Sequence, residues 1–578
     1  MFLPITRNEM SRRGWTALDV ILVTGDSYID APSIGVAVIG RVLLAAGYRV
    51  GVIPQPDVHS GADIQRLGEP RLFWGVTGGC VDSMVANYTA SGRKRKRDDY
   101  TPGGWNGRRP DRAAIVYSHL IRQHFKGTAP VALGGIEASL RRVAHYDFWS
   151  NKIRKSILVD AKADYLLHGM ADRSVVELAR CLRDGADPSR LAGLCYMARA
   201  LPDDCLRLPS FAETARDPFA FERMFHLFYR NNDPRTARRL AQRQDTRYLV
   251  HNPPAVPLSG PELDAVHELD YARELHPLCR EQGAVKALET IRFSIQSHRG
   301  CYGECNFCSI AVHQGRAVQA RSLASMVAEA RRLTRHPAFR GVISDVGGPT
   351  ANMYGIECAR KARCGACPQR RCLVPALCPD LELRHDRQVE LLQALRAVPG
   401  VRKVVVASGV RPDLVLADSR HGPAYLEALL RHHVSGQMKI APEHCDSALL
   451  ALMGKPDASV TVEFKRRFES LARKMERPPF LSYYMIAAHP GSALEDMDRL
   501  RAFALRHLKL LPRQIQIFTP TPSTYSTLMY WTERDPFTGR PCFVEKSVRG
   551  RQAQKDRCAP ASASRPSRRD PRCRTRAR

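Results

Sequence analysis

Short apolar runs alternate with amphipathic stretches along the first 200 residues of the chain. Runs that begin at Leu18, Arg49 and Leu72 are typical of buried strands, and the stretch from Ser33 places its apolar side chains at helical spacing. Glycines follow several of these strands, as in the segments TGDSYID, TGG and GGIEAS. Strand–helix alternation with glycine-rich strand ends predicts a doubly wound parallel sheet, and such sheets bind ligands at the carboxyl ends of their strands.

A second alternating series starts near residue 291. Its six apolar runs are separated by helical stretches, and polar or Gly/Pro-rich residues follow each run: TIRFSIQ, GVISDV, KVVVAS, QMKIAP, FLSYYMIAA and QIQIF. This pattern predicts a partial (β/α)6 barrel whose strand ends line one mouth. The fold class that we expect is therefore α/β, with a doubly wound sheet followed by a partial barrel.

The same patterns divide the chain into four parts. We expect a Rossmann-like domain over residues 1–200, a helical connecting region over 201–286 and the barrel over 287–545. Residues 546–578 hold twelve Lys or Arg against two Asp, and this composition predicts a disordered basic tail.

The composition narrows the class of protein. Of the 578 residues, 44% are hydrophobic and 25% are charged, which is typical of a globular protein. No apolar run approaches the roughly 20 residues that span a bilayer, and the first residues lack the long apolar segment of a secretory signal. We therefore expect a cytoplasmic protein with no membrane partner.

The formal net charge of +30 permits a nucleic-acid partner. The charge is uneven, because it concentrates in residues 546–578 and in the run GRKRKRDD from Gly92 to Asp99. A solvated basic tail is the simplest interpretation of the first concentration, and contact with RNA or DNA is the alternative.

The cysteines indicate a metal site. Eight of the seventeen cysteines fall between Cys301 and Cys378, and in a reducing compartment clustered thiols bind metal more often than they form disulfides. Cys301, Cys305 and Cys308 follow the first barrel strand with the spacing C-x3-C-x2-C. A structural zinc site uses four ligands, usually in two close pairs, whereas a cubane iron–sulfur cluster on three thiolates leaves one iron open to another ligand.

The segment CYGECNFC, with Phe307 before its last cysteine, resembles the signature of the radical S-adenosylmethionine (SAM) superfamily. The resemblance implies a [4Fe–4S] cluster on Cys301, Cys305 and Cys308, with SAM bound to the open iron. It implies reductive cleavage of SAM to a 5′-deoxyadenosyl radical, which abstracts a hydrogen atom from an unknown substrate. It also implies an electron donor such as a flavodoxin or a ferredoxin.

The resemblance assigns further residues to SAM by position. Gly347 and Gly348 occupy the place of a Gly-Gly-Glu segment after the second barrel strand, although Pro349 replaces the acidic residue. Ser408 follows the third strand and Glu443 follows the fourth, where each can contact SAM or the substrate. With Phe307, these residues form the expected SAM site.

The segments DSYIDAPSIGVAVIG, GVTGGCVDSMVANYTA, GGIEASLRRVAHYDFWS and DPFTGRP resemble the YgiQ-type radical SAM proteins over nearly the whole chain. This likeness implies that the first domain is related to cobalamin-binding folds, and it implies no substrate. An axial histidine for cobalt would need a D-x-H-x-x-G loop. The segment DVHSG, from Asp57 to Gly61, has the wrong spacing, so this motif gives cobalamin no support although binding without such a histidine is still an option.

Five further cysteines form a compact insertion after the second barrel strand: Cys358, Cys364, Cys367, Cys372 and Cys378. An auxiliary iron–sulfur cluster or a zinc site would each use four of them, and free thiols are the remaining interpretation. A zinc-dependent nucleic-acid-binding protein, with zinc on both cysteine groups, is the alternative to the radical enzyme. The identity of the metal separates these two functions.

Overall fold

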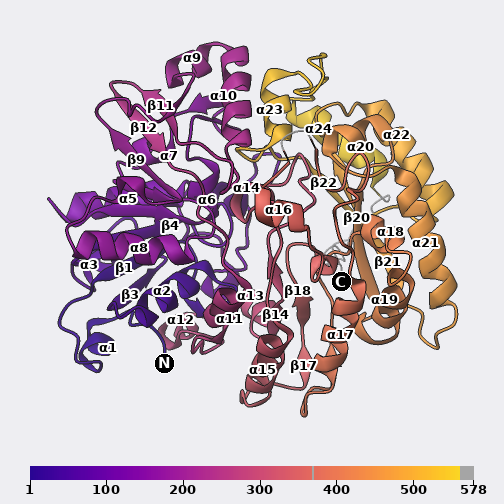
Figure 1. The fold of residues 1–578 in the computed structure, drawn as a ribbon, viewed down its shortest axis with the longest axis horizontal. Helices are drawn as coiled ribbons and strands as arrows, with labels where there is room; N and C mark the ends of the chain where they lie inside the picture. Colours follow the sequence, from indigo (N-terminus) through magenta and orange to yellow (C-terminus); the bar gives the residue numbers. More distant parts are fainter. Residues whose placement is uncertain (368–369, 560–578) are drawn as a thin grey trace, which may run out of the picture.

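The computed structural model describes residues 1–367 and 370–559, and these residues form two α/β units that lie side by side (Figure 1). The first unit, indigo to magenta in Figure 1, contains a nine-stranded sheet. The second unit, from rose through orange to yellow, contains the strands of the predicted barrel. Among the described residues, no helix is both long enough and apolar enough to cross a bilayer.

The centre of the first sheet is parallel, as the sequence predicts. Its strands lie in the order β3, β1, β4, β5 and β8, with the bounds Val50–Pro54, Val20–Thr24, Phe73–Thr77, Val131–Gly134 and Tyr165–Leu167. Every residue of β1 is buried, because helices cover both faces of the sheet. Helices α2 (Gly35–Ala45) and α8 (Asp172–Arg183) cover one face, and α5 (Ala113–His124) covers the other.

The region from 201 to 286 contains helices, but it is not the purely helical connection that we expected. Strands β10 (Leu206–Leu208), β11 (Leu240–Gln244) and β12 (Arg247–His251) extend the first sheet beyond β9 (Leu194–Ala198). Their apolar pattern is weak because β11 directs polar side chains inward. Within it, Gln242 Oε1 accepts hydrogen bonds from the amide of Ala144 and from Gln244 Nε2, each at 2.9 Å.

The six predicted barrel strands are present, and the second of them is divided into two short strands. They are β14 (Ser294–Gln296), β17 and β18 (Val342–Ile343 and Asp345–Gly347), β19 (Lys403–Val404), β20 (Gln437–Glu443), β21 (Phe480–Ala487) and β22 (Gln514–Ile517). All of their ladders are parallel: β14 with β18, β17 with β19, and β20 with β21 and β22. Helices α15 (Leu323–Thr334), α17 (His385–Arg396) and α21 (Ala458–Ala472) pack around these strands.

The first part of the expected disordered tail, from residue 546 on, is not disordered. Residues Val548–Cys558 form helix α24, which packs against helix α22 (Leu494–Phe503). Gln554 fixes the helix, because its Oε1 accepts from the amide of Ala488 at 2.8 Å and its Nε2 donates to Ser492 O at 2.7 Å. The buried residues of this helix include polar side chains, so the hydrophobic pattern of the sequence does not indicate that it packs against the barrel. The rest of the predicted tail, residues 560–578, lies outside the described residues.

Candidate functional site

The C-x3-C-x2-C segment lies at the mouth of the barrel, as expected from its place after the first strand. Cys301, Cys305 and Cys308 lie in the loop between β15 (His298–Arg299) and α14 (Ile310–His313) and line one cavity of about 200 Å³. Gly300 opens the loop with φ +81°, and a Cβ there would come within 1.9 Å of Ala317 O. Only glycine fits that turn.

The three thiols are half-buried and lie close to one another. Burial, and after it the charge of the neighbouring Cys305, raise the pKa of Cys301 and raise that of Cys308 to about 12. The amide of Gly303 donates to Cys301 Sγ at 3.3 Å. Three neighbouring thiolates therefore need a positively charged group, which iron in a cluster supplies, so the donor set fits an iron–sulfur cluster.

Arg411 contributes a buried positive charge beside these thiols. Its Nη1 donates toward Cys305 Sγ at 3.6 Å, while Nε and Nη2 donate to the carboxylate of Asp413 at 3.0 and 2.6 Å. Asn352 holds the backbone of Arg411 on both sides, since Oδ1 accepts from its amide and Nδ2 donates to its carbonyl. A Cβ at Gly303 would lie 2.8 Å from Nη1, so the glycine leaves room for the guanidinium.

The structure places some of the predicted SAM residues in this cavity and others beside it. Phe307 and Glu443 line the cavity together with the three cysteines. Gly347, Gly348 and Ser408 do not line it. Gly348 instead leaves room for His298, whose Nε2 would lie 2.6 Å from a Cβ, and the hydroxyl of Ser408 donates to Asp345. These three positions therefore lie beside the cavity and not in its wall.

Sequence reasoning missed Gly409 and Arg411, which both line the cavity. A Cβ at Gly409 would meet no atom within 4 Å, and this glycine does not have a positive φ. Neither packing nor backbone conformation therefore requires glycine at 409. A ligand that occupies the open space beside it would require a residue without a side chain. Both residues lie within three positions of Ser408 in the segment SGVRPD, so a wider search after the third strand would have found them.

Glu443 is a strained and buried carboxyl group at the end of β20. It has φ +73°, in the left-handed region that glutamate seldom adopts, and the ladder between β20 and β21 shifts register there. Burial raises its pKa to about 7, although Lys455, with Nζ 3.8 Å away, and Arg411 oppose that rise. Near neutral pH this side chain can donate or accept a hydrogen bond in the cavity.

The second group of cysteines surrounds Lys361. Cys358, Cys372 and Cys378 are buried, Cys367 is half-buried and Cys364 is exposed. Lys361 Nζ donates to Cys372 Sγ at 3.1 Å, and its amide donates to Cys358 Sγ at 3.4 Å. Within residues 1–367 and 370–559, no three donor atoms of this group gather closely enough for a single zinc ion.

This insertion braces the loop that carries the first three cysteines. Glu304, which lies between Cys301 and Cys305, has its carboxylate 3.7 Å from Lys361 Nζ and 3.6 Å from Arg316 Nε. Arg371 Nη1 donates to the carbonyl of Glu304 at 3.2 Å. The cysteine-rich insertion therefore holds the loop in place through contacts on both sides of Glu304.

A second cavity, of about 350 Å³, lies at the carboxyl ends of β1, β4, β5 and β8, and we call it the sheet-edge cavity. Apolar residues of the sheet and of helices α2 and α8 form its floor, and its rim is polar: Asp26, Cys80, Asp172, Arg299 and His313. A Cβ at Gly35 would meet nothing within 4 Å, and one at Gly134 would meet only Leu167 O at 4.0 Å. Both glycines thus leave space that no protein atom fills.

The two cavities meet at Ile310, which lines both of them. Ile310 is two residues from Cys308, so its side chain belongs to the wall of both cavities. The DVHSG segment is not part of this arrangement. His59 is exposed and does not line the sheet-edge cavity, in agreement with the spacing of the segment.

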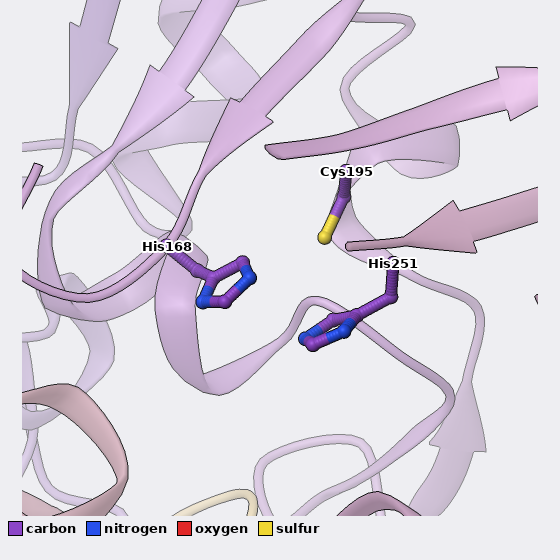
Figure 2. A group of neighbouring side chains, drawn as sticks. All are labelled: His168, Cys195 and His251. Carbon is purple, nitrogen blue, oxygen red and sulfur yellow. The ribbon is translucent and has the colours of Figure 1, made fainter. Parts of the chain in front are cut away.

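A third group of side chains, His168, Cys195 and His251, resembles a metal site (Figure 2). Their donor atoms lie within 4.8 Å of one another, but the two imidazole rings stack at 4.4 Å with an angle of 16° between them. An imidazole lone pair lies in the plane of its ring, and two nearly parallel planes do not meet at one ion. Arg142 Nε also donates to His251 Nε2 at 2.9 Å, which already places a positive charge beside the group. These residues are a buried polar cluster of the first sheet.

Comparison with known proteins identifies the family. Residues 2–294 match the family described as radical SAM N-terminal. The chain is 51% identical over 556 residues to the UPF0313 protein FN0734 of Fusobacterium nucleatum, covering 96% of this chain and 98% of that protein. It is 48% identical over 559 residues to a UPF0313 protein of Thermotoga maritima, with the same coverage of both chains.

A solved structure shares the fold. The cobalamin-dependent S-adenosylmethionine radical enzyme OxsB, with aqua-cobalamin bound, aligns with a TM-score of 0.50 and 13% identity. The alignment covers 91% of this chain and 57% of that one. The two-unit arrangement of sheet and barrel therefore recurs in a protein of very different sequence. Because residues 2–294 match this family and the UPF0313 relatives align over nearly the whole chain, the chain belongs to the radical SAM family as one of its UPF0313 proteins. It is a radical SAM enzyme.

Proposed function

We propose that the chain binds a [4Fe–4S] cluster through Cys301, Cys305 and Cys308 and binds SAM in the adjoining cavity. The observation that carries this proposal is that the three thiols line one cavity with Gly409, Arg411 and Glu443 at the mouth of a parallel barrel. When bound, such a cluster supplies the electron that cleaves SAM to methionine and a 5′-deoxyadenosyl radical. The substrate on which the radical acts is unknown.

The side chains around the cavity have distinct tasks in this proposal. The thiolates hold the cluster, and Arg411 supports Cys305 by donating toward its sulfur. Gly409 leaves room for the body of SAM, because a side chain there would project into open space. Glu443 and Lys455 provide a carboxyl group and an ammonium group, which can hydrogen-bond the polar groups of SAM.

The cluster needs a source of single electrons, so we include a flavodoxin or a ferredoxin among the partners. The alternative function, a zinc-dependent nucleic-acid-binding protein, gains nothing from the family assignment. A zinc ion on the second cysteine group also lacks a set of converging donor atoms among the described residues. An auxiliary iron–sulfur cluster on that group stays a prediction.

Iron and acid-labile sulfide analysis of anaerobically reconstituted protein tests the cluster assignment, together with electron paramagnetic resonance (EPR) of the reduced state. We expect a reduced-cluster signal that changes when SAM is added. Cys305→Ala should abolish the signal, whereas Cys205→Ala, at a half-buried cysteine in the first unit, should preserve it. Zinc in place of iron, or an intact signal in Cys305→Ala, would contradict the proposal.

We further propose that the sheet-edge cavity binds a cobalamin. Three observations support this: the apolar floor with a polar rim, the unfilled space at Gly35 and Gly134, and the shared wall at Ile310. The fold of OxsB, which binds aqua-cobalamin, is consistent with them. A bound cobalamin would supply a cobalt centre next to SAM, and the residues of this chain would hold it by enclosing its apolar parts and hydrogen-bonding its polar edge.

Titration of the purified protein with aquacobalamin, followed by visible absorption, tests this second assignment. Gly35 is the first residue of α2, and Gly260 is the first residue of helix α11 (Gly260–Glu268), outside the cavity. We expect Gly35→Leu to prevent binding by filling the cavity and Gly260→Leu to leave binding unchanged. Equal binding by both variants would contradict a site in this cavity.

A further inference from the structure

The run RKRKR, residues 93–97, is a concentration of charge that the proposed reaction does not use. Its five side chains are exposed. In the part of the chain that the structure describes, none of them forms an ion pair with a carboxylate: Arg93, Lys94, Arg95, Lys96 and Arg97. Five adjacent cations repel one another, and this repulsion is uncompensated within the described residues.

The run forms no regular strand, but backbone hydrogen bonds and isolated β-bridges hold it in place. The amide of Arg95 donates to Asn87 O at 2.7 Å, and the amide of Asn106 donates to Lys96 O at 3.2 Å. An antiparallel bridge pairs Arg97 with Trp105. We call residues 93–105 the basic hairpin. Its backbone fixes the spacing of like charges, which would favour the binding of a polyanion there.

Trp105 gives the basic hairpin an aromatic surface. Its side chain is 69% exposed and lies across from Arg97. The turn before it contains Gly103 and Gly104, both with positive φ, so the backbone presents the indole outward through a conformation that glycine favours. An exposed indole beside cations is the arrangement on which a nucleic-acid base stacks.

The base of the hairpin is rigidly attached to the first sheet. Arg109 is buried between Asp98 and Asp26, with N–O distances of 3.0 and 2.7 Å. Gln55 Nε2 donates to Thr101 Oγ1 at 2.7 Å. Because Asp26 lies on the rim of the sheet-edge cavity, a ligand on the hairpin would be held near that cavity.

Helix α24 extends the basic surface. Arg551 Nη1 donates to Ala90 O at 3.1 Å, which joins the helix to the segment before the hairpin. The helix carries further cations, among them the exposed Arg549. Two basic elements that are far apart in the sequence therefore form one surface.

We propose that the basic hairpin binds single-stranded nucleic acid, with phosphates on the cations and a base on Trp105. Cations alone also attract an anionic membrane, but residues 93–97 offer no apolar side chain that would insert next to the single indole, whereas an exposed indole suits stacking on a base. The proposal does not depend on the cluster or on SAM. It assigns the enzyme a polyanionic partner, for which single-stranded RNA is the probe of choice.

Fluorescence anisotropy of the full chain with a short labelled single-stranded RNA, over a series of salt concentrations, tests the proposal. We expect Trp105→Ala to weaken binding about tenfold without changing the salt dependence. Lys94→Ala/Lys96→Ala should weaken binding and reduce the slope of log affinity against log salt by about 1.4, because each phosphate contact on a single strand contributes about 0.7. Arg473→Ala/Lys474→Ala, at exposed cations after helix α21, should change neither quantity.

Three outcomes would overturn the proposal. One is the absence of RNA binding by the unmodified chain, and another is equal affinity in all three variants. A third is a loss in Trp105→Ala of binding to phosphatidylserine vesicles with RNA binding unchanged, which would assign the surface to a membrane. Circular dichroism of each variant ensures that a loss of affinity is not a loss of folding.

Discussion

Arg411 Nη1 lies 3.6 Å from Cys305 Sγ, and Gly303 provides the room for it. Arg411 follows the third barrel strand, and Cys305 is the second cysteine of the motif that follows the first strand. The fold therefore places a buried guanidinium from one loop beside a thiol of another. The charge is fixed in place, because Asp413 and Asn352 hold its other polar groups. In the proposed enzyme this cation would lie directly against the cluster.

Replacement of Arg411 should lower the reduction potential of the cluster. A nearby positive charge and an N–H donor to sulfur both stabilise the added electron, so Arg411→Gln should shift the midpoint potential to more negative values. An EPR-monitored redox titration measures the shift. Arg466→Gln, at an exposed arginine of α21, is the control. Equal potentials in the two variants would show that Arg411 does not influence the cluster.

Gly409→Leu should separate binding of SAM from binding of the cluster. The new side chain would extend into space where no protein atom lies within 4 Å of the Cβ, so the chain should fold and keep its iron. We expect the effect of SAM on the EPR signal to disappear, whereas Gly260→Leu should retain it. If Gly409→Leu responds to SAM like the unmodified protein, the ligand does not occupy this part of the cavity.

Stability of the metal-free protein should fall as the pH rises, because of Glu443. Burial raises the pKa of this carboxyl from 4.5 to about 7, so the folded state retains a proton that the unfolded chain releases between these values. The contribution to stability is complete below pH 4.5 and is lost as the pH rises through about 7. Its upper limit is about 3 kcal/mol.

Urea unfolding at about pH 5 and about pH 8 measures this effect. Glu443→Gln cannot ionise, so its midpoint should change less between the two conditions than that of the unmodified protein. The same dependence in both proteins would assign the effect to other groups.

Lys361→Met should destabilise the loop of the three cysteines. The substitution leaves the buried Glu304 carboxylate with Arg316 alone and removes the donor to Cys372 Sγ. We expect a loss of about 2 kcal/mol and a lower melting temperature, because a buried carboxylate loses a charged partner. Lys474→Met, at an exposed lysine, should change the melting temperature little. An unchanged melting temperature in Lys361→Met would show that the insertion does not brace the loop.

The apolar runs predicted the six barrel strands and the parallel centre of the first sheet because these strands bury apolar side chains in a regular pattern. Strand β1 is buried throughout, and β20 and β21 bury alternate residues. The apolar runs did not predict β10–β12 or α24, whose inward-facing residues include Gln242, Gln244 and Gln554. Hydrogen bonds to buried amides allow these polar residues to lie inside, and the hydrophobic pattern carries no trace of such bonds.

The candidate site was predicted only in part for a related reason. The cysteine spacing is local, so it is visible in the sequence. The roles of Arg411 and Gly409 arise from the closing of the barrel, which brings the end of the third strand to the loop after the first. The empty space at Gly35 and Gly134 likewise exists only once helices α2 and α8 pack on the sheet.

The most direct test of the central claim is the formation of 5′-deoxyadenosine from SAM by the reconstituted, dithionite-reduced protein. Chromatography with mass detection quantifies the product. The account predicts that the unmodified protein and Cys205→Ala form it, and that Cys305→Ala does not. Failure of iron-loaded protein to form 5′-deoxyadenosine, or equal formation by Cys305→Ala, would contradict the assignment of this site to reductive cleavage of SAM.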